Sequence, residues 1–237
     1  MDIAGMTEVT GENKYLHMLS KNSGDFTNEV QKAEAKINNI MLTVNNAEGD
    51  ADKQKGETLR KLSEATDKYN TLFRMIIKEF CEDYKLTLPS DGKDHSADIA
   101  NALHIVEMLG VNIDIDNLDN ILSPLSKDFK SLKTVGEVIL AKSRNSFNNA
   151  YSVDVIEAVT KRLGLDTGIH EFNARMDFLK GIWETPTQYY RYMMNGNVKV
   201  KLTTMPSYTA LAAPDWIKET AEMYNKIKQS DFYKSMI

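Results

Sequence analysis

The sequence contains a single cysteine, only five prolines and no long apolar run. One thiol excludes an internal disulfide framework and a zinc site built from several cysteines. The longest apolar runs, such as residues 138–141, fall far short of the roughly 18 residues that a membrane-spanning helix requires. Residues 1–8 lack the charged and apolar regions of a signal peptide. We therefore expect a soluble chain that has no membrane partner.

Familiar catalytic and ligand-binding motifs are also missing. The glycines form neither a phosphate-binding loop nor a dinucleotide-binding fingerprint, and no G-x-S-x-G or H-E-x-x-H occurs. Residues 112–119 are rich in oxygen ligands, but a calcium loop needs Gly and Glu where Asn117 and Ser123 stand. We interpret them as a polar turn with a helix cap at Asp116. Cys81 precedes two acidic residues, which raise a thiol pKa instead of lowering it. We expect no enzymatic activity, no cofactor and no bound metal.

The charge is mildly negative and uneven along the chain. The formal net charge is −5, and within residues 1–50 four lysines stand against eight acidic residues. A nucleic-acid-binding protein needs a basic patch or stripe, which this gradient does not supply. We therefore expect protein partners, including copies of the chain itself, and no specific nucleic-acid ligand.

Two heptad patterns are the clearest structural signal. Their apolar residues are spaced alternately three and four apart, which predicts two helices that pack along narrow stripes. The polar residues 45–50 separate them, so we expect a long antiparallel coiled-coil hairpin over residues 27–88, after a loose arm at 1–26. The first stripe consists of Val30, Ala33, Ile37, Ile40 and Val44, and the second of Leu59, Leu62, Thr66, Tyr69, Phe73, Ile76 and Phe80.

The pattern changes after Pro89. Shorter apolar-periodic stretches follow, and stop signals at Gly110, Pro124 and Gly164 separate them. They predict a bundle of short helices over residues 89–185. The fold class we expect is mainly α, with the hairpin packed on this bundle.

A different pattern occupies residues 186–214. Asn195-Gly196 is a turn signal, and residues 198–202 alternate with period two, which predicts a small β-hairpin or extended arm. A final helix and tail are expected over 215–237, including Trp216. Aromatic and cationic residues in the arm are consistent with core packing, a protein interface or single-stranded nucleic acid. The candidate interaction residues are Tyr189, Tyr190, Arg191, Tyr192, Lys199, Lys201 and Trp216.

A projecting hairpin, a small bundle and an extended arm favour a non-enzymatic assembly protein that acts through protein–protein contacts. The plan is similar to that of the helical connector, collar and ring proteins of tailed-phage virions, a similarity of architecture without a shared motif. The expected location is the cytoplasm or a virion assembled there. Two alternatives remain: a regulatory or inhibitory module that binds one protein partner, and an enzyme whose motifs are unfamiliar.

Overall fold

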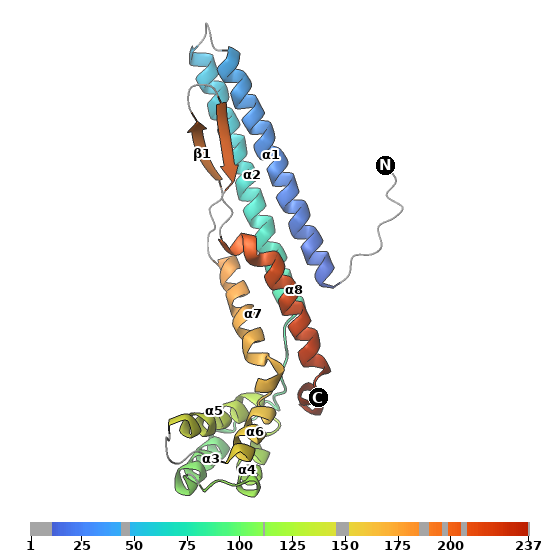
Figure 1. The fold of residues 1–237 in the computed structure, drawn as a ribbon, viewed down its shortest axis with the longest axis vertical. Coiled ribbons are helices and arrows are strands. Elements are labelled where there is room, and N and C mark those ends of the chain that lie inside the picture. Colours follow the sequence, from blue (N-terminus) through green and yellow to red (C-terminus); the bar gives the residue numbers. More distant parts are fainter. Residues whose placement is uncertain are drawn as a thin grey trace, which may run out of the picture. The chain divides into compact units, whose positions relative to one another are not determined.

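The structure is a computed structural model that describes residues 11–43, 48–110, 112–145, 152–184, 190–195, 199–204 and 208–236. Over these residues the chain is mainly α-helical, as the periodicity predicted. No helix among them is long and apolar enough to cross a membrane. The elements are α1 (Glu12–Thr43), α2 (Glu48–Asp83), α3 (Ser96–Leu109), α4 (Ile115–Leu122), η1 (Ser123–Leu125), α5 (Phe129–Asn145), α6 (Val153–Arg162), η2 (Leu165–Thr167), α7 (Ile169–Glu184), β1 (Tyr190–Asn195), β2 (Lys199–Thr204), α8 (Tyr208–Gln229) and α9 (Asp231–Met236) (Figure 1).

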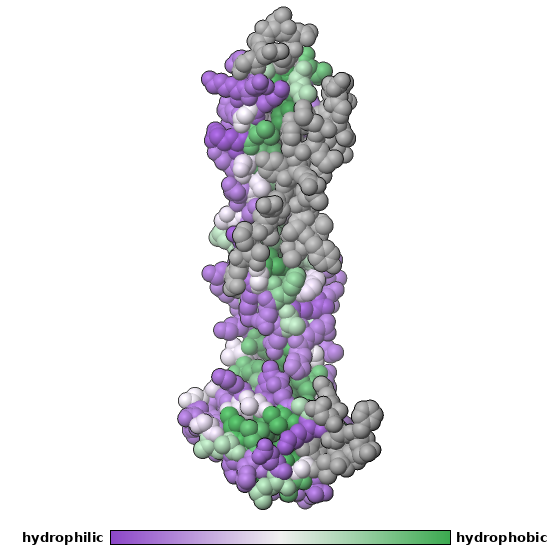
Figure 2. All heavy atoms as spheres, turned by 90° about the vertical axis from the view of Figure 1, so that its left-hand side faces the viewer, coloured by the Kyte–Doolittle hydropathy of each residue, from purple (hydrophilic) through white to green (hydrophobic). Residues whose placement is uncertain are grey.

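The elements divide into two compact units, each built from two separate stretches of chain. The first unit combines the residues up to Lys85 with Ala174–Ala221, and the second combines Leu86–Asn173 with Glu222–Ile237. Helices α7 and α8 therefore contribute residues to both units. In the surface view, patches of apolar residues in green are visible between hydrophilic residues in purple (Figure 2).

Helix α1 begins at Glu12, so the prediction of a loose arm up to residue 26 is wrong for residues 12–26. Tyr15, Leu19 and Phe26 are buried in this stretch, and they extend the apolar side of the helix toward its start. Polar residues separate these three apolar ones, so the sequence pattern predicts a stripe that begins only at Val30. Their burial stabilises the first turns of α1.

Helices α1 and α2 run antiparallel and pack through their apolar sides. Phe26 of α1 stacks on Tyr69 of α2, with ring centroids 4.7 Å apart, and Tyr15 meets Phe80 edge to face at 5.3 Å. Of the residues predicted for the stripes, Val44 lies outside the described residues, and Leu59 and Tyr69 are partly buried. The buried ones are Val30, Ala33, Ile37, Ile40, Leu62, Thr66, Phe73, Ile76 and Phe80.

The buried positions depart from the strict heptad spacing on both helices. On α1 they step by four twice, from Asn22 to Phe26 and from Phe26 to Val30. On α2, Thr58 is buried where the pattern predicted Leu59, and its hydroxyl donates to the oxygen of Gln54 at 2.8 Å. An extra four-residue step locally unwinds the supercoil of paired helices. The pair is therefore less regular than the sequence pattern predicted.

The second unit packs short helices around a separate apolar core. Val106, Leu118, Val135 and Val159 are completely buried in it. Phe232 of α9 lies edge to face against Phe129 of α5, at 5.9 Å. A Cβ at Gly164, whose φ is +63°, would lie only 2.6 Å from the Phe232 ring, so glycine is needed there. The residues at the end of the described chain are thus part of this core.

The backbone around the strands differs from the prediction at one boundary. Strand β1 pairs antiparallel with β2, and β2 lies alongside α1 in the first unit. Helix α8 begins at Tyr208 and contains Pro214, whereas a helix from residue 215 was predicted. Pro214 lacks an N–H, so the second turn of α8 is without the hydrogen bond that another residue would donate there. Because proline disfavours a helix interior, the sequence predicts a helix that begins only after Pro214.

The α1–α2 contact predicts a large difference between two truncations on one helix. Ile37 is 0% exposed, so Ile37→Ala should lower the free energy of unfolding by about 2–5 kcal/mol through lost burial and a cavity. Leu42→Ala is the matched control, since Leu42 is 69% exposed, and it should change that free energy by less than about 0.5 kcal/mol. Denaturant unfolding followed by circular dichroism measures both. Equal effects would mean that Ile37 is not buried in solution.

Candidate functional site

The strand pairing sorts the predicted interaction residues into two sets. Tyr189 lies outside the described residues, and the other arm residues occupy β1 and β2. Residues directly opposite in an antiparallel pair share a face of the ribbon, and neighbours along a strand alternate between faces. The three cationic residues therefore fall together at one set of positions, and the tyrosines fall at the other. The first set is Arg191, Met193, Asn195, Lys199, Lys201 and Thr203, and the second is Tyr190, Tyr192, Met194, Val200, Leu202 and Thr204.

Trp216 is the one predicted interaction residue whose side chain is described. It is partly buried in the first unit, and its ring lies 4.2 Å from that of Phe178 on α7. The guanidinium of Arg175 sits over the same ring at 5.2 Å and forms an ion pair with Glu219. Packing and a cation–π contact hold Trp216 in place. The indole is therefore part of the α7–α8 contact within the chain.

A groove in the first unit lies along α1, and the sequence analysis missed it. Its volume is about 670 Å³. One side is a run of small residues spaced three, one and three apart on α1, and this spacing places them on one helix face. The spacing of these small residues is visible in the sequence, but it indicates a groove only when the residues that face it, Tyr69, Phe73 and Pro214, are known. The lining residues are Leu16, Leu19, Ser20, Ser23, Gly24, Thr27, Asn28, Tyr69, Phe73 and Pro214.

A buried histidine is the main electrostatic feature of the second unit. His95 is 8% exposed; its Nε2 lies 2.9 Å from Asp91 and its Nδ1 lies 3.0 Å from Asp98. These hydrogen bonds, that to Asp98 first, raise the pKa of His95 because two carboxylates favour the protonated ring. The pKa of Asp91 is lowered chiefly by the same contact. His95 therefore links the chain before α3 to the first turn of α3.

Asp128 anchors the neighbouring start of α5. Its carboxylate accepts hydrogen bonds from the backbone N–H and the hydroxyl of Ser131, at 2.9 and 2.5 Å. The hydroxyl contact, followed by one from Ser90, holds the pKa of Asp128 at about 2. The N–H of Phe129 also donates to the oxygen of Pro89 at 3.0 Å. These bonds organise the start of α5 and the chain that precedes it.

The other polar residues considered in the sequence analysis have structural roles. Asp114, and not Asp116 as predicted, caps α4 by accepting a hydrogen bond from the Asn117 N–H at 2.8 Å. Among the described residues, no three acidic, histidine or cysteine side chains are grouped to hold a metal ion. Cys81 is buried, and burial raises its thiol pKa to about 12, with a smaller contribution from Glu82. A thiol this weakly acidic is a packing residue.

Comparison with known proteins finds no matching family model, no matching curated protein and no matching solved structure. The surfaces described above are therefore the basis for a functional proposal. Of these, the α1 groove is open on the first unit, whereas Trp216, His95 and Asp128 are engaged in contacts within the chain.

The histidine contacts predict a specific pH dependence of stability. Because the pKa of His95 is raised on folding, its stabilisation is complete below the ordinary value of about 6.5 and is lost as the pH rises through the raised value. The unfolding temperature of the wild type, relative to His95→Gln, should therefore fall from about pH 6 to about pH 9. Thermal denaturation across this range measures it.

His104→Gln serves as the control for this experiment. His104 lies exposed on α3 of the same unit, so the variant should keep the pH dependence of the wild type. If the curves for the wild type and His95→Gln run parallel, His95 does not bind its two carboxylates as a cation.

Proposed function

We propose that this chain is a non-enzymatic structural protein that assembles with copies of itself, or with other assembly subunits, through protein–protein contacts. In this proposal α1 and α2 form an antiparallel coiled-coil hairpin, and β1 and β2 form a β-hairpin arm. The assembly that we propose is a connector, collar or ring of a phage virion, by analogy of plan alone.

The α1 groove is the observation that carries the proposal. Gly24 lies in the middle of a helix, where glycine costs roughly 0.5–1 kcal/mol relative to alanine. A Cβ at Gly24 would meet nothing within 4 Å, so no contact among the described residues requires a glycine there. Small residues let another backbone approach a helix closely. We propose that a helix of a neighbouring subunit fills the groove.

The rest of the first unit adds two features that suit an interface. The floor of the groove includes the aromatic residues Tyr69 and Phe73, which offer apolar area to an incoming helix. We propose that the β1–β2 ribbon, whose sequence includes Arg191, Lys199 and Lys201, forms a second contact with an acidic surface. We propose that the groove supplies binding energy and that the ribbon supplies orientation.

Two glycine substitutions test this proposal with a matched control. Gly24→Leu should fill the groove and abolish self-association, while the helix itself becomes more stable by about 1 kcal/mol through higher helix propensity. Gly56→Leu makes the same change on α2, where a Cβ also meets nothing within 4 Å, and should leave association intact. Light scattering at several concentrations gives the mass, against 26.8 kDa for one chain.

The measured masses distinguish assembly through the groove from assembly elsewhere and from a monomer. A wild type that exceeds one chain mass at high concentration, with only Gly24→Leu monomeric, supports assembly through the groove. A wild type that stays monomeric at every concentration contradicts self-assembly and leaves the regulatory module that binds one partner. Equal loss of association in both variants would place the interface elsewhere.

A further inference from the structure

The second unit contains an open cavity that the proposed assembly does not use. Its volume is about 550 Å³, within the range of small-molecule sites. Four parts of the chain wall it: the end of α4 with η1, helix α5, the last turns of α6, and α9. Its lining residues are Leu122, Ser123, Ser126, Leu132, Ala158, Lys161, Arg162, Asp231, Phe232, Ser235 and Met236.

The cavity has an apolar floor. Leu122, Leu132 and Phe232 are at most 8% exposed, and Ala158 and Met236 are partly buried beside them. Phe232 is held in place by its contacts with Phe129 and Gly164, so this wall is built into the core. Such a floor favours a hydrocarbon group over water.

Two adjacent cations lie at the cavity wall formed by α6. Arg162 forms an ion pair with Asp119 of α4, which orients the guanidinium and leaves other N–H groups of its five available. Burial lowers the pKa of Arg162, because its charge is partly removed from water. Lys161 makes no ion pair with any other described residue. Arg162 can bind a carboxylate, and Lys161 adds a second positive charge to the same wall.

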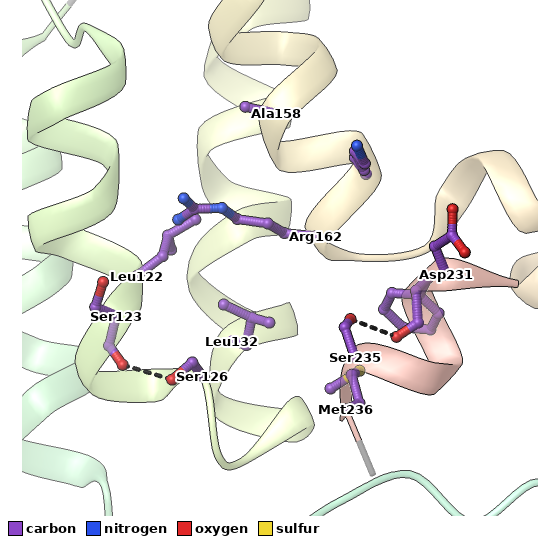
Figure 3. A pocket seen from close by; sticks show the side chains of 11 residues that line it. Leu122, Ser123, Ser126, Leu132, Ala158, Arg162, Asp231, Ser235 and Met236 are labelled. Carbon is purple, nitrogen blue, oxygen red and sulfur yellow. Dashed lines mark hydrogen bonds between the residues drawn. The ribbon is translucent and has the colours of Figure 1, made fainter.

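The other polar groups that line the cavity are serine hydroxyls and one carboxylate, that of Asp231. Figure 3 shows Arg162 extending from α6 toward Leu122 and Ser123, while Asp231 and Ser235 stand on α9 across the cavity. The hydroxyls of Ser126 and Ser235 donate to backbone oxygens, both at 2.8 Å. Asp231 is exposed at the rim. An anionic head group is therefore favoured on the Arg162 side and disfavoured near α9.

We propose that this cavity binds a small amphipathic carboxylate, with its carboxyl group at Arg162 and Lys161 and its hydrocarbon chain over Leu132 and Phe232. A medium-chain fatty acid is the chemical class that fits. The site is independent of the α1 groove, since every lining residue belongs to the second unit.

Three probes with one tail and different head charges test the proposal: octanoate, octanol and octylammonium. The readout is the Met236 methyl signal in NMR spectra of the full chain with methyl-labelled methionine. Octanoate should shift this signal saturably, octanol should bind about tenfold more weakly, and octylammonium should not bind. Failure of octanoate to move the signal, or equal binding of all three probes, overturns the proposal.

Variants separate the head-group site from the apolar floor. Arg162→Gln should weaken octanoate about tenfold and leave octanol unchanged, whereas Lys130→Gln, a charge change outside the cavity, should alter neither. Ala158→Leu narrows the cavity and should abolish binding of both probes. If circular dichroism shows Arg162→Gln to be unfolded, Lys161→Gln takes its place, because Lys161 is exposed. Wild-type affinity in the folded charge variants overturns the assigned head-group site.

Discussion

Asn22 places an amide within the apolar contact between α1 and α2, and its Nδ2 donates to the backbone oxygen of Tyr69 at 3.0 Å. A polar group buried in such a seam favours a register that gives it a partner, because a buried amide without a hydrogen bond is costly. The stacking of Phe26 on Tyr69 belongs to the same register. The α1 groove depends on it too, since Tyr69 and Phe73 line its floor.

Much of this helical architecture is predictable because the apolar residues of each helix recur at a regular local spacing. The stripe residues Ile37, Leu62 and Phe80 were identified from spacing alone, and all three are buried. Asn22 and Thr58 were missed for a physical reason: a polar residue inside a seam is indistinguishable by pattern from one on a solvated face. The start of α8 was predicted too late because proline is uncommon inside a helix, where it removes a hydrogen bond, yet Pro214 lies within α8.

The cavity and the groove lay beyond sequence reasoning because they join distant residues. Leu122 and Phe232 share a wall of the cavity, yet nothing in the spacing of either residue indicates the other. The Asp91–His95–Asp98 cluster is different: its members are four and three residues apart, and this local signal was open to detection. Local chemistry can thus be inferred from a single sequence, whereas surfaces shared by remote segments require coordinates.

The interleaving of the two units has a consequence for synthesis on the ribosome. The chain passes between units at residues 85/86, 173/174 and 221/222, and the second unit receives Phe232 and Tyr233 only after the first unit has received Ala213 and Ile217. A nascent chain that ends before α8 can pair α1 with α2 but leaves both units incomplete. The final helices therefore close the two units in quick succession, and until then apolar surface is exposed to chaperones and proteases.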